Sequence, residues 1–216
     1  MQDNQGTTSG GLTPENHHFL PHAGLSGPGR LQSRESIGAL IRALEARDPY
    51  TGEHSRRVTA VACQFAVYLS LPSPDVDILR TAGQLHDLGK VGIKDAILLK
   101  PGSFTPEERE IIKTHPAIRK KIVEPLGLRA PEQDLILHHH ERWDGRGYPG
   151  SLAGDEIPFL CQILALADCF DAITTDRPYR RGCDLPKALS EIQACAGSQF
   201  NPFLARRFVA IASAFN

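Results

Sequence analysis

Apolar residues recur every three or four positions along most of the chain, which is the spacing that places them on one face of an α-helix. Two clear stretches of this kind are Val58, Val61, Phe65 and Leu69, and then Ile157, Leu160, Cys161 and Leu164. The chain lacks the strict alternation of apolar and polar residues that is typical of a half-buried strand, and it has no internal repeat with a period of about 20 to 50 residues. The pattern therefore predicts an all-α fold in which the helices form a compact bundle.

Helix starts are indicated where a short polar residue is followed closely by proline, because the polar side chain accepts hydrogen bonds from free backbone amides and proline is tolerated in the first turn. These sites are Ser73-Pro74, Thr105-Pro106, Asp184 with Pro186, and Asn201-Pro202. Thr105 and Glu108 also have the spacing of a capping box, in which each side chain binds the backbone amide of the other residue. We expect helices to begin at all four positions.

Residues 1–34 differ from the rest of the chain, with six glycines, three prolines, few charged residues and no apolar periodicity. Such a segment buries too little surface to offset the entropy that is lost on ordering. We therefore expect a disordered leader or linker over 1–34 and one folded domain over 35–216. His17, His18 and His22 lie in this leader, and we interpret them as part of the disordered segment rather than as metal ligands.

Composition and charge add constraints on partners and location. With 41% hydrophobic and 23% charged residues, the 216-residue chain is typical of one globular domain, and its formal net charge of -1 argues against binding to duplex nucleic acid. Its five cysteines include no C-x-x-C pair, which argues against a disulfide framework. No apolar stretch approaches the roughly 20 residues that span a bilayer, and no signal peptide is recognisable, so we expect a cytoplasmic protein without membrane insertion.

Histidine and aspartate residues extend several of the apolar stripes, so their side chains are expected to point into the core. His54 lies four residues before Val58, on the same helical face. His86 continues the apolar face of the next helical segment, and Asp87 lies beside it. Gly89 is expected to end that helix.

Three more histidines fall near predicted helix ends. His115 is expected at a break, because Pro116 would clash with the carbonyl of Ile112 in a continuous helix. His139 and His140 each lie four residues after an apolar residue and offer two adjacent imidazoles near the end of their helix. All three side chains are therefore expected to face the interior.

Two aspartates, Asp168 and Asp171, extend the apolar stripe of a later helix, and periodicity alone does not choose between them. A lone histidine on an apolar stripe is more often a hydrogen-bonded core residue than a ligand. Five histidines and two or three aspartates directed into one interior would be costly to bury unless metal ions compensated their polarity. Imidazole and carboxylate together suit first-row divalent metals, so the pattern predicts a metal centre.

Two local motifs resemble those of a known family. Residues 86–90 read H-D-L-G-K and residues 139–149 read H-H-E-R-W-D-G-R-G-Y-P. The first resembles the signature of the HD superfamily of metal-dependent phosphohydrolases, and the second resembles the longer signature of its HD-GYP branch. The resemblance covers roughly residues 35–212 and implies an HD-type helical bundle around a metal centre. It also implies a role in bacterial signal transduction, the hydrolysis of cyclic di-GMP to linear pGpG and, in some members, onward to GMP.

The resemblance also implies a set of metal ligands. One metal would be held by His54, His86, Asp87 and Asp168, and a second by Asp87, as a bridge, together with His115, His139 and His140. Asp171 and Glu141 then become residues that orient a ligand or a water. Iron or manganese is the preferred metal, and zinc, nickel or cobalt also suit these ligands.

The number of metals is indicated by one departure from the family pattern. Some members with three metals carry a glutamate four residues before the first histidine ligand, and this chain has Tyr50 there. A phenol is a poor substitute for that carboxylate. We therefore expect two metals, which makes a second cleavage, from pGpG to GMP, less certain.

The expected reaction is attack on phosphorus by a hydroxide that bridges the two metals, at a site that contains Asp87 and Lys90. Lys90 is expected to stabilise charge on the phosphoryl oxygens, although a lysine at a helix end is also favourable without such a role. Substrate contacts are further expected from Arg177, Arg180, Gly147, Tyr148 and Pro149. Gly145, Gly147 and Gly150 formally fit the spacing of a dinucleotide-binding motif, but they lack its flanking strand and helix, and we expect the glycines to allow positive φ angles in a tight loop instead.

Two alternatives stay open at this point. The chain could be a catalytically weak binding or scaffold module of the same fold, although no expected ligand is missing apart from the Tyr50 position. It could also be an HD phosphohydrolase that acts on another cyclic dinucleotide. The expected small-molecule partner is cyclic di-GMP, and regulatory or signalling proteins are possible further partners.

Overall fold

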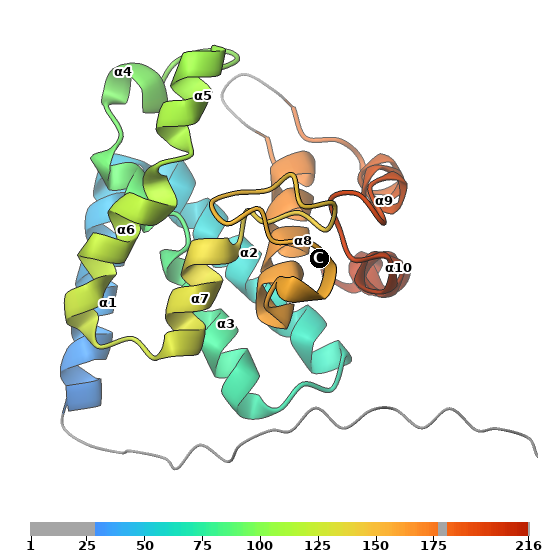
Figure 1. The fold of residues 1–216 in the computed structure, drawn as a ribbon, viewed down its shortest axis with the longest axis horizontal. Coiled ribbons are helices and arrows are strands. Elements are labelled where there is room, and N and C mark those ends of the chain that lie inside the picture. The colour runs from blue at the N-terminus through green and yellow to red at the C-terminus, as the bar shows by residue number, and fades with distance from the viewer. Residues whose placement is uncertain (1–28, 177–180, 216) are drawn as a thin grey trace, which may run out of the picture.

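The computed structural model describes residues 29–176 and 181–215, and within these ranges it is built from helices and loops without a β-strand. The α-helices are α1 Gly29–Arg47, α2 Pro49–Tyr68, α3 Ser73–Leu85, α4 Asp95–Leu98, α5 Pro106–Ile112, α6 His115–Val123, α7 Ala130–His138, α8 Phe159–Thr174, α9 Leu185–Ala194 and α10 Pro202–Ile211. Short 3-10 turns are η1 Leu88–Gly92, η2 Glu124–Leu126, η3 Gly154–Glu156 and η4 Ala212–Ala214. The predicted all-α fold is confirmed (Figure 1).

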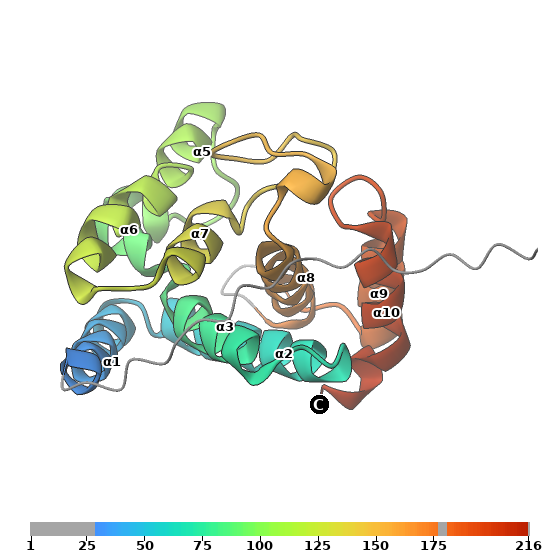
Figure 2. The same cartoon turned by 60° about the horizontal axis from the view of Figure 1, so that its bottom comes forward.

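Helices α2, α3 and α8 form the middle of the bundle, where α2 packs against both α3 and α8. Helices α1 and α6 lie on one side of this middle layer, and α9 and α10 lie on the other, as Figures 1 and 2 show. The buried ring of Phe208 in α10 contacts two other buried rings edge to face. Its centroid lies 5.1 Å from that of Phe65 in α2 and 5.3 Å from that of Phe170 in α8. Burial of such rings is a large favourable term, and it joins the outer α10 to the middle of the fold.

The predicted helix starts are confirmed at all four positions, and at three of them a polar side chain caps the first turn. Thr105 and Glu108 form the expected capping box, Asp184 accepts from the amide of Lys187, and Asn201 accepts from the amide of Leu204. Helix α3 begins at Ser73 as predicted, with Pro72 as its N-cap residue and no side-chain cap. Ser73 is therefore the first residue inside the helix, one position after the N-cap.

The expected leader concerns residues that are largely outside the described part of the chain. Helix α1 begins at Gly29, and residues 1–28 lie outside the described residues, so a leader over 1–34 stays a prediction. None of the described helices combines the length and apolar character that crossing a lipid bilayer requires. The five cysteines are free thiols, in line with the absence of a disulfide framework.

Candidate metal centre

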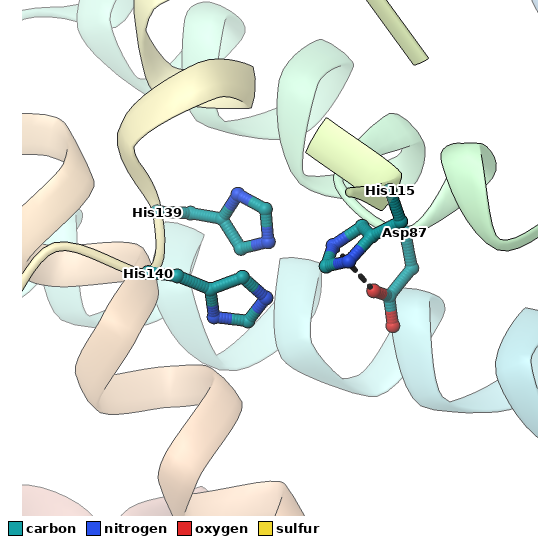
Figure 3. Close-up of side chains that lie close together, drawn as sticks. All are labelled: Asp87, His115, His139 and His140. Carbon is teal, nitrogen blue, oxygen red and sulfur yellow. Dashed lines mark ion pairs between the residues drawn. The ribbon is translucent and has the colours of Figure 1, made fainter. Parts of the chain in front are cut away.

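The ends of four helices converge on one buried cluster of imidazoles and carboxylates. The cluster consists of two overlapping groups whose ligand atoms lie within 4.8 Å of one another. One group contains His54, His86 and Asp87, and the other contains Asp87, His115, His139 and His140. Figure 3 shows the second group, with the rings of the adjacent histidines at the end of α7 facing His115 and the carboxylate of Asp87. The structure therefore brings together six of the seven residues expected as ligands.

Asp87 is the residue that the two groups share, and its two oxygens face different imidazoles. Its Oδ1 lies 3.6 Å from Nε2 of His115. Its Oδ2 lies 3.5 Å from Nε2 of His86 and 3.7 Å from Nε2 of His54. The side chain is 3% exposed and follows directly after the C-cap of α3. A buried carboxylate with this arrangement could serve as a ligand for a cation in either group.

Three of the buried imidazoles have a defined tautomer that leaves one nitrogen free for a metal. Nδ1 of His86, His115 and His139 donates to the backbone carbonyl three residues earlier, at 2.6, 2.8 and 2.9 Å respectively. A carbonyl only accepts hydrogen bonds, so the proton lies on Nδ1 and the lone pair on Nε2. These three Nε2 atoms are buried and have no hydrogen-bond partner among the described residues. Buried polar atoms without partners are costly, and a divalent cation between them would compensate that cost.

The protonation states of four imidazoles are also those of metal ligands. Burial lowers the pKa of His115 to about 4 and that of His140 to about 3. Burial also lowers the pKa of His86 and of His139. All four rings are therefore neutral near pH 7, which is the form that binds metals.

His54 has a different environment from the other imidazoles. Burial acts to lower its pKa, but hydrogen bonds and charge from Asp168 and Asp171 outweigh burial and raise the pKa to about 9. Nε2 of His54 lies 3.1 Å from Oδ1 of Asp168. Its Nδ1 donates to Oδ2 of Asp171 at 2.6 Å. Asp168 is the one expected ligand outside the two groups, although its contact with His54 places it at their edge.

The expected substrate contacts lie at three places. Nζ of Lys90 is 2.6 Å from Oδ2 of Asp87, so this cation borders the cluster. The ring centroids of Tyr148 and His140 lie 4.8 Å apart. Nζ of Lys113 lies over the Tyr148 ring, 5.9 Å from its centroid. Arg177 and Arg180 lie outside the described residues, and their expected contacts stay predictions.

The loop that carries Tyr148 is held in place by backbone contacts. The carboxylate of Glu141 accepts from the amides of Gly150 and Leu152 at 2.6 and 3.1 Å, so it braces this loop. A Cβ atom at Gly147 would lie 2.4 Å from the backbone nitrogen of Arg142. The expected positive φ is present at Gly145, at 73°, and absent at Gly147 and Gly150. At Gly147 the close approach of the backbone requires glycine instead.

Gly89 does not end a helix as the sequence analysis expected. Helix α3 ends at Leu85, and Gly89 lies inside the turn η1, with no positive φ. A Cβ atom at this position would lie 1.9 Å from the carbonyl oxygen of His115 and 2.9 Å from Cβ of Arg119. The missing side chain therefore lets the segment that follows Asp87 pack directly against the start of α6, which brings the two groups of ligands together.

Replacing Gly89 with alanine is expected to lower the free energy of unfolding by about 2–3 kcal/mol, because the added methyl group meets a backbone carbonyl that cannot rotate away. Chemical denaturation followed by circular dichroism measures this change. Gly38→Ala is the matched control, since Gly38 lies within α1 and its added Cβ would meet only the end of the Arg42 side chain at 3.3 Å. Equal stability of the Gly89→Ala variant and the wild type would contradict the close approach.

Two arginines near the cluster were missed by the sequence analysis. Arg119 is fully buried in α6 and donates from Nη1 to the carbonyl of Leu85 at 3.2 Å, at the end of α3. Burial lowers its pKa to about 9. Arg57 of α2 donates to Asp171. The available signal was spacing: Arg119 follows His115 by four residues and Arg57 follows His54 by three, so each shares a helix face with an expected ligand.

Comparisons with known proteins place the chain in a family and agree with its fold. A family model described as HD domain matches residues 38–204. The chain is 39% identical over 173 residues to the cyclic di-GMP phosphodiesterase response regulator RpfG of Xanthomonas campestris pv. campestris, covering 79% of this chain and 46% of that protein. It is 41% identical over 170 residues to a cyclic di-GMP phosphodiesterase of Thermotoga maritima, covering 76% of this chain and 45% of that protein.

A solved structure has the same fold. The cyclic GMP-AMP-specific phosphodiesterase V-cGAP3 of Vibrio cholerae matches with a TM-score of 0.64 at 21% sequence identity, covering 87% of this chain and 49% of that chain. This likeness concerns the fold. The chain spans about half the length of the curated relatives that it matches.

Proposed function

The chain belongs to the HD domain family and to its HD-GYP branch, and from this premise we propose that it hydrolyses cyclic di-GMP to linear pGpG. The observation that carries the proposal is the position of Asp87, whose two oxygens face different groups of inward-pointing imidazoles. The names of the relatives from Xanthomonas and Thermotoga support this substrate.

Two divalent ions in this centre would lower the pKa of a water, so that a hydroxide nucleophile is available near pH 7, and would stabilise charge on the phosphoryl oxygens. His54, His86, Asp87 and Asp168 would hold one ion, and Asp87, His115, His139 and His140 the other. The donor set supports iron or manganese first, with zinc, nickel or cobalt as alternatives. The three buried Nε2 atoms without partners support ion binding by these side chains.

The side chains around the cluster have separate tasks in the proposed reaction. Lys90 borders Asp87 and places a positive charge where negative charge develops on the phosphoryl group. The loop of Gly147, Tyr148 and Pro149 lies beside His140 and forms one wall for the substrate, with Tyr148 able to stack on a base. Glu141 keeps that wall in place through the amides of the loop.

We further propose that the centre holds two ions rather than three. The ring of Tyr50 lies parallel to that of His54, with centroids 6.2 Å apart and an angle of 5° between the planes. An aromatic ring thus lies one turn before this expected ligand, where a third metal would need a carboxylate. A phenol is a poor substitute for a carboxylate ligand of a divalent cation, so cleavage is expected to stop at pGpG.

The test is incubation of the metal-loaded protein with cyclic di-GMP, followed by chromatography that separates pGpG from GMP. We expect cyclic di-GMP to disappear and pGpG to accumulate when the protein is reconstituted with Fe²⁺ or Mn²⁺ without oxygen. No turnover with either metal would contradict the enzyme hypothesis and favour a binding module. Rapid conversion of pGpG to GMP would contradict the proposed arrest at pGpG.

Cyclic GMP-AMP is the competitor substrate for the same assay, because the V-cGAP3 structure shares the fold and its name states that specificity. Faster turnover of cyclic GMP-AMP than of cyclic di-GMP would move the assignment to a different cyclic dinucleotide. The cytoplasmic location and regulatory protein partners stay predictions.

A further inference from the structure

His54 differs from three other imidazoles of the cluster in the group that holds its Nδ1. His86, His115 and His139 donate from Nδ1 to backbone carbonyls of their own helical segments. His54 donates instead to the Asp171 carboxylate, at 2.6 Å, across the contact between α2 and α8. A carboxylate partner makes an imidazole a stronger electron donor than a carbonyl does, and it fixes the orientation of the ring. The strength of His54 as a ligand therefore depends on where Asp171 is held.

Asp171 is itself held by two further donors. Arg57 donates from Nε to Oδ1 at 2.6 Å and from Nη2 to Oδ2 at 3.2 Å, which is a forked contact between planar groups. The hydroxyl of Thr175 donates to Oδ1 at 3.1 Å. The carboxylate is 4% exposed, so these protein contacts replace water around it. Removal of the fork would leave a buried carboxylate with only part of its hydrogen bonds.

Arg57 lines a cavity that none of the expected metal ligands lines. A cavity of about 350 Å³ is lined by Arg57, Asp171 and Thr175 together with other side chains of α2 and α8 and with residues of the C-terminal part of the chain. The Arg57 side chain is 37% exposed, whereas that of His54 is 5% exposed. A small planar cation can therefore reach the position of the guanidinium without passing through the ligand cluster.

From these contacts we infer that Arg57 is a positioning residue for the metal centre, which acts on His54 through Asp171. This inference rests on the proposed metal centre. Arg57 and His54 lie on the same helix three residues apart, so both side chains meet the same carboxylate of α8. The fork fixes the carboxylate, the carboxylate fixes Nδ1 of His54, and Nε2 of His54 is thereby kept directed at Asp87 and Asp168.

The test is calorimetric titration of the metal-free Arg57→Ala protein with Mn²⁺. We expect the Kd of the ion at the His54 group to rise about 10- to 100-fold, which is the usual effect of losing a partner behind a metal ligand. Millimolar methylguanidinium chloride is expected to restore most of that affinity by entering the cavity, while the same concentration of KCl is not. Arg57→Lys, which keeps the charge without the fork, is expected to show a smaller loss and serves if the alanine variant fails to fold.

Arg56→Ala is the matched control. Arg56 is the neighbouring arginine on α2, its side chain is 58% exposed, and it pairs with Glu45 instead of Asp171. Wild-type Mn²⁺ affinity in Arg57→Ala, or a loss equal to that of Arg56→Ala, would overturn the inference. A loss that methylguanidinium does not reverse would also overturn it, because that result would indicate altered helix packing. Failure of the wild-type protein to bind Mn²⁺ would contradict the metal centre itself and this inference with it.

Discussion

Replacement of Asp87 by alanine is expected to lower the turnover of cyclic di-GMP by at least about 1,000-fold. Its two oxygens face both groups of imidazoles, so the substitution removes a negatively charged ligand from both proposed ion positions at once. It also leaves Nζ of Lys90 without the carboxylate that lies 2.6 Å away. Turnover is measured by chromatography of the nucleotides, and bound metal by elemental analysis of the same sample.

Asp77→Ala is the control for this loss. Asp77 lies within α3, ten residues before Asp87, but it is 60% exposed and pairs with Arg80 on the same helix. We expect its turnover and metal content to match those of the wild type. If Asp87→Ala kept both ions and more than a tenth of the wild-type turnover, Asp87 would not be the bridge between them.

Removal of metal is expected to lower the Tm by roughly 8–16 °C, for a protein held at a free metal concentration about 1,000-fold above its Kd. The reason is that ions bind the folded cluster and not the dispersed ligands of the unfolded chain, so they stabilise the folded state by about 4 kcal/mol at that concentration. In the metal-free state the buried Nε2 atoms of His86, His115 and His139 have no hydrogen-bond partner among the described residues. Differential scanning calorimetry with Mn²⁺ and with EDTA measures the difference.

The same scans on Asp87→Ala separate this effect from unspecific stabilisation by cations. Without the shared carboxylate, that variant is expected to show a much smaller difference between Mn²⁺ and EDTA, whereas Asp77→Ala is expected to behave like the wild type. A wild-type Tm that does not respond to EDTA would contradict a metal centre built from these side chains. An equal response in wild type and Asp87→Ala would place the bound ions elsewhere.

Much of the fold and of the candidate site was predictable because the signals are local. The capping box of Thr105 and Glu108 depends on four consecutive residues, and the structure contains it. The inward direction of His54 and the break before His115 follow from helix periodicity and from proline, and both are present. The role of Gly89 was predicted wrongly, because a glycine can either end a helix or allow a close backbone contact, and its neighbours in space decide which role applies.

The sequence by itself determined that the chain is helical and that its histidines and aspartates point into a shared interior, since periodicity and capping depend on backbone geometry over a few residues. Only the tertiary structure decided which atoms meet there. His54 and Asp171 are 117 residues apart, and Arg57 reaches the same carboxylate because α2 packs against α8. Likewise, the two oxygens of Asp87 face different imidazoles because the turn that contains Gly89 packs closely against α6. Such contacts depend on how distant helices pack, which no short stretch of sequence records.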